Sequence, residues 1–377
     1  MPVKDMRAAR NPYIQDLRGY AAMLVVVNHA LPTMEHFRPL PKSIEDLAAG
    51  LGALGVHIFF VISGFIMTHI SSESFGRPRA SLSFLMARVQ RVAPLYYCAT
   101  FVAILHAMAT SRSYKGSDIA LSLLFLPSHA QHDLSGYLFP VLGVGWTLNY
   151  EMFFYLLFAI ALSFKRSTGI ALLTSALLFL IVIGSGLRWL SHPPVGASMA
   201  FDLPYYFTRD IMIYFVLGIL MALLRRHRRF PSVAIPVPAL LGCALGTSEV
   251  VVFTLLEPDQ YPAWRIGVTI LVAVAAVGLC IVAAPRKQSR VTGALGDASY
   301  SIYLFHDFFL SIITSLWLGW FGKSFVAGEI LSCVVLGAGG GYLVYLWVER
   351  PLSAITRQKA VRRVTTMNQS LLSIEQG

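Results

Sequence analysis

Apolar runs of about 20 residues recur along almost the whole of this 377-residue chain. At a rise of about 1.5 Å per residue, each run forms a helix about 30 Å long, which matches the hydrocarbon core of a bilayer. Only 13% of the residues are charged, whereas soluble proteins carry about 25%. This pattern excludes a soluble enzyme, a fibrous protein and a disordered chain, and it predicts an all-α, polytopic integral membrane protein.

Ten of these runs are long enough to cross a bilayer as helices. They cover residues 14–33, 50–70, 92–110, 145–164, 168–190, 208–225, 232–256, 264–284, 298–318 and 325–348. A further apolar segment, 117–127, is too short to cross, so we predict that it is a re-entrant or interfacial helix.

The distribution of basic residues predicts the orientation of the chain. If the N-terminus is cytoplasmic and 117–127 does not span, 22 of the 30 Lys and Arg residues lie on the cytoplasmic side. If 117–127 spans, only 12 of the 30 do. Because cytoplasmic loops are enriched in Lys and Arg, the first arrangement is favoured, with both termini cytoplasmic. The same enrichment accounts for the net charge of +11, so no nucleic-acid partner is expected.

Ionisable side chains inside apolar runs are costly and therefore mark candidate functional sites. His29 follows Arg18 by 11 residues, which places both on one helix face about 16 Å apart. Glu151 lies early in the fourth span, at a depth expected to be close to that of His29. We predict that His29 is a general base oriented by Glu151. For each residue the alternative is a structural hydrogen bond to a neighbouring helix.

Arg88 and Arg91 lie three residues apart at the cytoplasmic end of the third predicted span, on one helix face. Two neighbouring guanidinium groups suit a phosphate-bearing ligand. The alternative is that they are ordinary positive-inside residues that only set the orientation of the chain.

A third set of residues is predicted to line a substrate channel. For His306, hydrogen bonding between helices is an equally good interpretation, and the glycines around Ser63 also favour close helix packing. No metal-binding motif is present in the sequence, so no metal is expected. The predicted channel residues are His57, Ser63, Tyr155, Tyr303 and His306.

Six short motifs, taken in order, resemble those of the acyltransferase-3 family, the integral-membrane O-acyltransferases of bacterial surface polysaccharides. The resemblance covers about residues 11–355. One departure is Met152, where many members have a second Glu, which leaves Glu151 as the single carboxylate. A fused extracytoplasmic hydrolase-like domain, which some members carry, is not expected. The matching positions are Arg18, Gly19, Ala22 and His29; Gly55 to Phe65; Arg88, Arg91 and Pro94; Trp146 to Tyr155; Ser299 to His306; and Glu349 to Pro351.

The resemblance implies transfer of an acyl group, usually acetyl from acetyl-CoA, to a hydroxyl group of an exopolysaccharide or other cell-surface glycan. It also implies a multi-pass protein of the bacterial inner (cytoplasmic) membrane, with a membrane acyltransferase domain at 1–357 and a polar cytoplasmic tail at 358–377. The expected partners are acyl-CoA, the bilayer, and a polysaccharide or lipid-linked oligosaccharide acceptor.

On this interpretation Arg18, Arg88 and Arg91 hold the coenzyme phosphates at the cytoplasmic mouth, and His29 acts on the acceptor hydroxyl or on an acyl relay. The alternative function is a transporter or flippase of a lipid-linked glycan, with His29 and Glu151 as a proton relay. A non-catalytic scaffold would not require so many buried ionisable groups.

Overall fold

The computed structural model describes residues 11–36, 39–130, 138–191, 206–227, 263–282, 289–322 and 325–355. This part of the chain is helical, and its only strand-like pairing is an isolated bridge between His129 and Phe139. The predicted span 232–256 and the predicted tail 358–377 lie outside the described residues.

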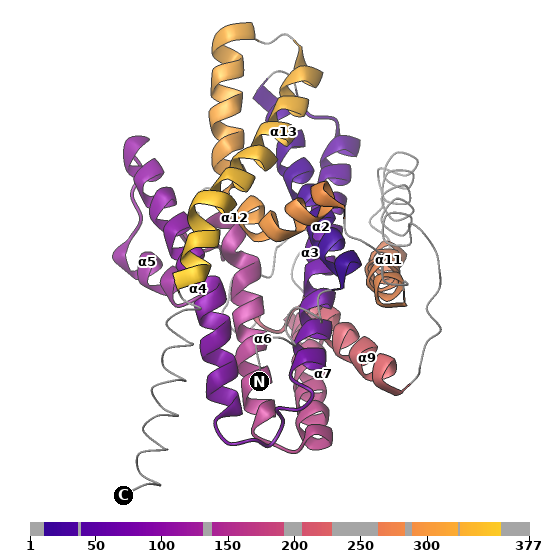
Figure 1. Cartoon of the computed structure of the whole chain (residues 1–377). Coiled ribbons are helices and arrows are strands. Elements are labelled where there is room, and N and C mark those ends of the chain that lie inside the picture. The colour runs from indigo at the N-terminus through magenta and orange to yellow at the C-terminus, as the bar shows by residue number, and fades with distance from the viewer. Residues whose placement is uncertain are drawn as a thin grey trace, which may run out of the picture.

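Nine of the ten predicted spans fall on described helices (Figure 1). Six helical segments within the described residues are long and apolar enough to cross a membrane. The α-helices are α2 (Pro12–Ala30), α3 (Lys42–Ile70), α4 (Ala80–Ala109), α5 (Gly116–Leu123), α6 (Trp146–Leu162), α7 (Arg166–Ser191), α9 (Ile213–His227), α11 (Ala263–Val282), α12 (Arg290–Phe321) and α13 (Val326–Val344). Short 3₁₀ turns precede or follow them at η1 (Leu31–His36), η2 (Gly143–Gly145) and η3 (Asp210–Met212).

The short apolar segment 117–127 contains only α5, a helix of eight residues. A helix of that length extends about 12 Å, far less than the thickness of the hydrocarbon core. This length agrees with the prediction that the segment does not cross the membrane.

Three helices begin two to three turns before the apolar runs that predicted them. Helix α3 starts at Lys42, α4 at Ala80 and α12 at Arg290. Hydropathy detects only the apolar part of a helix, whereas backbone hydrogen bonding continues through polar residues. One consequence concerns Arg88 and Arg91, which belong to α4 itself and not to a loop before it.

Helix α2 packs against both α3 and α12 (Figure 1). Small residues bring the backbones close at the α2–α12 crossing. A Cβ atom added to Gly296 would collide with the carbonyl oxygen of Gln15, and one added to Gly19 would lie 2.8 Å from the Gly296 nitrogen. These two glycines therefore set the distance between the helices that carry His29 and His306.

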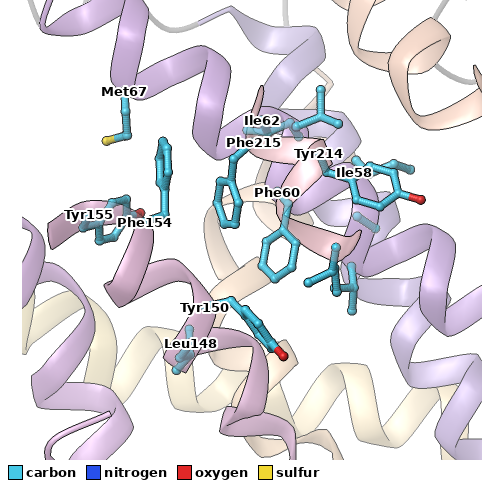
Figure 2. Packing of buried hydrophobic residues seen from close by; sticks show 14 of the residues in the cluster. Ile58, Phe60, Ile62, Met67, Leu148, Tyr150, Phe154, Tyr155, Tyr214 and Phe215 are labelled. Carbon is cyan, nitrogen blue, oxygen red and sulfur yellow. The ribbon is translucent and has the colours of Figure 1, made fainter. Parts of the chain in front are cut away.

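Helix α3 crosses α9 in the same way, because Cβ atoms at Gly64 and Gly218 would collide with backbone atoms of the facing helix. The predicted role of the glycines of the second span in close helix approach is thus confirmed. Beside this crossing the rings of Phe60, Phe154 and Phe215 stand in a row (Figure 2). Their ring centroids are 4.6 Å apart for Phe60 and Phe215 and 4.3 Å apart for Phe154 and Phe215.

The last described helix changes its winding near the end. After α13, residues Tyr345–Glu349 form a π-helical turn, labelled η4. A π turn inserts one extra residue and so rotates the side chains that follow it. Glu349 is buried there, with 4% of its surface exposed.

Candidate active site

A cavity of about 170 Å³ lies among α2, α3, α4, α6 and α12. Its wall combines apolar side chains with three guanidinium groups and one carboxylate. Figure 2 shows Phe60, Ile62, Met67, Leu148 and Tyr155, which belong to this wall. The polar and ionisable residues that line it are Arg18, Ser63, Arg88, Arg91, Thr147, Glu151, Tyr155, Ser299, Tyr300 and Tyr303.

The structure brings together the three arginines that were predicted to bind the coenzyme. Arg18 comes from α2, and Arg88 and Arg91 come from α4. Separated by about 70 residues in the sequence, these side chains meet only because α4 lies alongside the bundle that contains α2 and α12. Three cations at one small cavity create a local field that attracts anions.

The two arginines of α4 have different surroundings. Arg91 Nη1 lies 3.2 Å from Glu349 Oε1, so this guanidinium already has a carboxylate partner. The Arg88 guanidinium lies over the Phe84 ring, 5.6 Å from its centroid, and its buried Nε has no hydrogen-bond partner within the described residues. The Arg88 charge is therefore the more available of the two for an anionic ligand.

Glu349 is the residue of this region that sequence reasoning missed as a site residue, because it was named only as part of the last family motif. The structure places it in the protein interior, where it also accepts a 2.6 Å hydrogen bond from Ser301 Oγ. One sequence feature could have indicated this role. Glu349 is a carboxylate at the end of an apolar helix, and a buried carboxylate requires a cation such as Arg91 as its partner.

Glu151 lies at the cavity, but its neighbours differ from those expected. Its Oε1 accepts hydrogen bonds from Ser63 Oγ at 2.8 Å and from the Tyr155 hydroxyl at 2.5 Å. Its charge also interacts with that of Arg18. Within the described residues its hydrogen bonds do not include one to His29, because the helix packing places this carboxylate at the cavity that also holds the arginines.

The hydrogen-bond partner of His29 on another helix is His306. His29 Nδ1 lies 3.2 Å from His306 Nε2, and the ring centroids are 4.9 Å apart. Neither histidine is among the residues that line the cavity, although Tyr303, one turn before His306 on α12, is. The Tyr303 hydroxyl donates to the Val144 carbonyl at 2.9 Å and lies 2.7 Å from Thr147 Oγ1. Tyr303 thus belongs to the cavity wall and also lies next to the histidine pair, with its ring centroid 6.4 Å from that of His306.

Of the five predicted channel residues, Ser63, Tyr155 and Tyr303 line the cavity and the two histidines do not. For His306 the structure supports the alternative of hydrogen bonding between helices. His57 faces α9, where its ring stacks on Tyr214 at a centroid distance of 3.8 Å and an interplanar angle of 12°. The periodicity of α3 explains why Ser63 lines the cavity and His57 does not. Residues three or four apart share a helix face, and the face that meets the cavity contains Val56, Phe59, Phe60 and Ser63.

Comparison with known proteins identifies the chemistry of this arrangement. Residues 11–346 match the family described as "Acyltransferase domain". The chain belongs to the acyltransferase-3 family. It is therefore an acyltransferase, and the resemblance inferred from its motifs is confirmed.

Two curated relatives of this acyltransferase carry informative names. It is 32% identical over 324 residues to the exopolysaccharide production protein ExoZ of Rhizobium meliloti (strain 1021), covering 84% of this chain and 93% of ExoZ. It is 23% identical over 386 residues to the putative peptidoglycan O-acetyltransferase YrhL of Bacillus subtilis (strain 168), covering 94% of this chain but only 56% of YrhL. No solved structure matches the chain.

Residues from different family motifs meet at two places in this acyltransferase. Arg18, Arg88, Arg91 and Glu151 come from three separate motifs and meet at one cavity. His29 and His306 come from the first and fifth motifs and meet each other. Across the described ranges, no three His, Cys, Asp or Glu side chains converge in a way that could hold a metal ion.

Proposed function

We propose that this acyltransferase moves an acetyl group from acetyl-CoA to a hydroxyl group of an exopolysaccharide or another cell-surface glycan. The acceptor is a polysaccharide or a lipid-linked oligosaccharide at the bacterial inner membrane. The names of ExoZ, an exopolysaccharide production protein, and YrhL, a putative peptidoglycan O-acetyltransferase, support a glycan acceptor.

The observation that carries the proposal is the convergence of Arg18, Arg88 and Arg91 on one cavity. Guanidinium groups bind phosphate through paired, charge-assisted hydrogen bonds. An acyl-CoA presents its phosphates at one end and its thioester at the other. We assign the phosphates to the arginines, with Arg88 as the principal contact because Arg91 is paired with Glu349.

Glu151 acts in this scheme as a positioning residue. Its carboxylate holds the hydroxyl groups of Ser63 and Tyr155 and offsets the charge of Arg18 inside the cavity. The side chains around the arginines are thereby held in one arrangement without excess positive charge.

His29 is the general base for the acceptor. It removes the proton of the attacking hydroxyl group as the new ester C–O bond forms and the thioester C–S bond breaks, and the proton then passes to the departing thiolate. Because His29 and His306 do not line the cavity that holds the arginines, we place the acceptor at the histidine pair and the coenzyme phosphates at the arginines. In the predicted orientation the acceptor end faces the periplasm.

The transporter alternative is the less well supported, because it used His29 and Glu151 as one proton relay. Within the described residues, Glu151 is bonded to Ser63 and Tyr155, and His29 is bonded to His306.

The orientation is tested by reporters fused to the intact chain. With ten spans and both termini cytoplasmic, a reporter after Gly377 or one inserted near Arg228 should behave as cytoplasmic, and one near Gln260 as periplasmic. These insertion points lie outside the described residues. A periplasmic signal from the Arg228 insertion would mean that the segment 117–127 crosses the membrane.

The activity itself is tested with purified protein in detergent, acetyl-CoA labelled in the acetyl group, and exopolysaccharide oligosaccharides as acceptor. We expect ester-linked label on the oligosaccharide, released by mild base. Label that stays on the coenzyme or appears only as free acetate would contradict the proposal. Glycan uptake into proteoliposomes without any coenzyme would instead support a transporter.

A further inference from the structure

The contacts of the histidine pair determine which ring nitrogen of each residue carries a proton. His29 Nδ1 lies 2.9 Å from the backbone carbonyl oxygen of Val25. His306 Nδ1 lies 3.0 Å from the carbonyl oxygen of Ile302. A carbonyl oxygen can only accept a hydrogen bond, so in both neutral rings the proton is assigned to Nδ1.

The opposite assignment is unfavourable at both rings. With the protons on Nε2, each Nδ1 lone pair would point at a carbonyl lone pair about 3 Å away. The Asn28 amide lies 3.3 Å from His29 Nδ1, but it does not decide the matter because an Asn amide can present either its oxygen or its nitrogen.

This assignment makes His306 an acceptor for His29. His306 Nε2 carries a lone pair and lies 3.2 Å from the protonated Nδ1 of His29, which therefore shares its hydrogen between His306 and the Val25 carbonyl. The remaining nitrogen, His29 Nε2, is unprotonated. It has no hydrogen-bond partner within the described part of the chain.

The turn η1, which directly follows the helix of His29, and the helix of His306 are also tied together by hydrogen bonds. Buried Glu329 of α13 accepts hydrogen bonds from Thr33 Oγ1 at 2.9 Å and from Thr314 Oγ1 at 2.8 Å. Thr33 follows His29 by four residues and Thr314 follows His306 by eight, so each lies near its histidine along the chain. These bonds limit movement of one ring relative to the other.

We propose that His306 is a positioning residue that holds His29 in the tautomer with a basic Nε2. When Nε2 takes the proton of the acceptor hydroxyl, the bond from Nδ1–H to His306 becomes charge-assisted and therefore stronger. His306 thus performs, as a neutral acceptor, the role that sequence reasoning gave to Glu151. The inference rests on the proposed function, because it takes His29 as the general base.

Two substitutions of His306 separate this role from simple packing. In His306→Gln, the amide oxygen can reach the position of Nε2 and still accept from His29. In His306→Asn, the amide nitrogen replaces Nδ1 and keeps the bond to the Ile302 carbonyl, but His29 keeps only the Val25 carbonyl as an acceptor and loses the one on the neighbouring helix. We expect turnover per folded molecule to fall only a few-fold in the Gln variant and about 10- to 100-fold in the Asn variant, the range seen when a partner that orients a functional imidazole is removed. The KM for acetyl-CoA should not change in either variant, because His306 does not line the cavity.

A spectroscopic measurement tests the tautomer without activity. In ¹⁵N-histidine-labelled protein, the signals that disappear in His29→Asn belong to His29, and they should report a protonated Nδ1 and an unprotonated Nε2. In His306→Asn the Val25 carbonyl still accepts from Nδ1, so Nδ1 should stay protonated, but its chemical shift should move because the hydrogen bond to His306 is lost. A protonated Nε2 in the unsubstituted protein, or equal turnover of the Asn and Gln variants, would overturn the inference.

The outcomes also distinguish this inference from the proposed function. Normal turnover of His29→Asn would remove His29 as the base and overturn both proposals. A large loss in His29→Asn together with normal turnover in His306→Asn would overturn only the role of His306.

Discussion

Replacing His29 by alanine should lower turnover per folded molecule by about 10²–10⁴-fold, which is the usual contribution of a positioned general base. The affinity for acetyl-CoA should barely change, because His29 lies outside the cavity that contains the three arginines. The measurement is the initial rate of label transfer to the oligosaccharide, divided by the amount of monodisperse protein.

The design of this experiment depends on which nitrogen of His29 makes the structural contacts. Because Nδ1 contacts both Val25 and His306, asparagine is the substitution best able to keep the fold while removing the base. His29→Asn should therefore match the unsubstituted protein in yield and resemble His29→Ala in rate. His106→Ala removes an exposed histidine of α4 and is the matched control, with no loss of rate expected. A near-normal rate in well-folded His29→Asn would show that the histidine only joins the helices.

Replacing Arg88 by alanine should weaken acetyl-CoA binding by tenfold or more. Two charge-assisted hydrogen bonds to phosphate contribute roughly 1.5–3 kcal/mol each, and about 1.4 kcal/mol corresponds to a factor of ten. Arg88 is the best position for this test because no carboxylate within the described residues pairs with it. Binding is measured by calorimetry with purified protein, and turnover at saturating donor should change much less than affinity.

The matched control for Arg88 is Arg77→Ala. Arg77 is an exposed residue of the turn between α3 and α4, so in the predicted orientation its removal takes away one positive charge from the same side of the membrane without touching the cavity. Unchanged coenzyme affinity in a normally inserted Arg88→Ala variant would show that this arginine only sets the orientation of the chain. Arg91→Ala is less informative because it also leaves buried Glu349 without its cation.

Most of the helical architecture could be predicted from local sequence. The length of an apolar run and its flanking charges are properties of about 20 consecutive residues, so nine of the ten predicted spans fall on described helices. Where predictions of helix ends were wrong, as at Lys42 and Ala80, the reason is that hydropathy does not detect the polar turns of a helix.

The residue types of the site were also predictable, because a bilayer makes unpaired ionisable groups expensive wherever they occur. His29, Glu151 and the three arginines all belong to the two clusters that the structure forms. Helical periodicity correctly placed Arg88 and Arg91 together at the cavity, since that inference needed only a spacing of three residues within one helix.

The sequence by itself thus determined the fold class, the family and the residues that carry ionisable groups into the protein interior. Only the tertiary structure decided which of these groups are partners. The partner of His29 on another helix is His306, 277 residues away, and the partners of Glu151 are Ser63 and Tyr155. Such pairings depend on the rotation and depth of each helix relative to its neighbours. Those are determined by close contacts such as Gly19 with Gly296 and by the π turn that ends at Glu349, which no single span of sequence encodes.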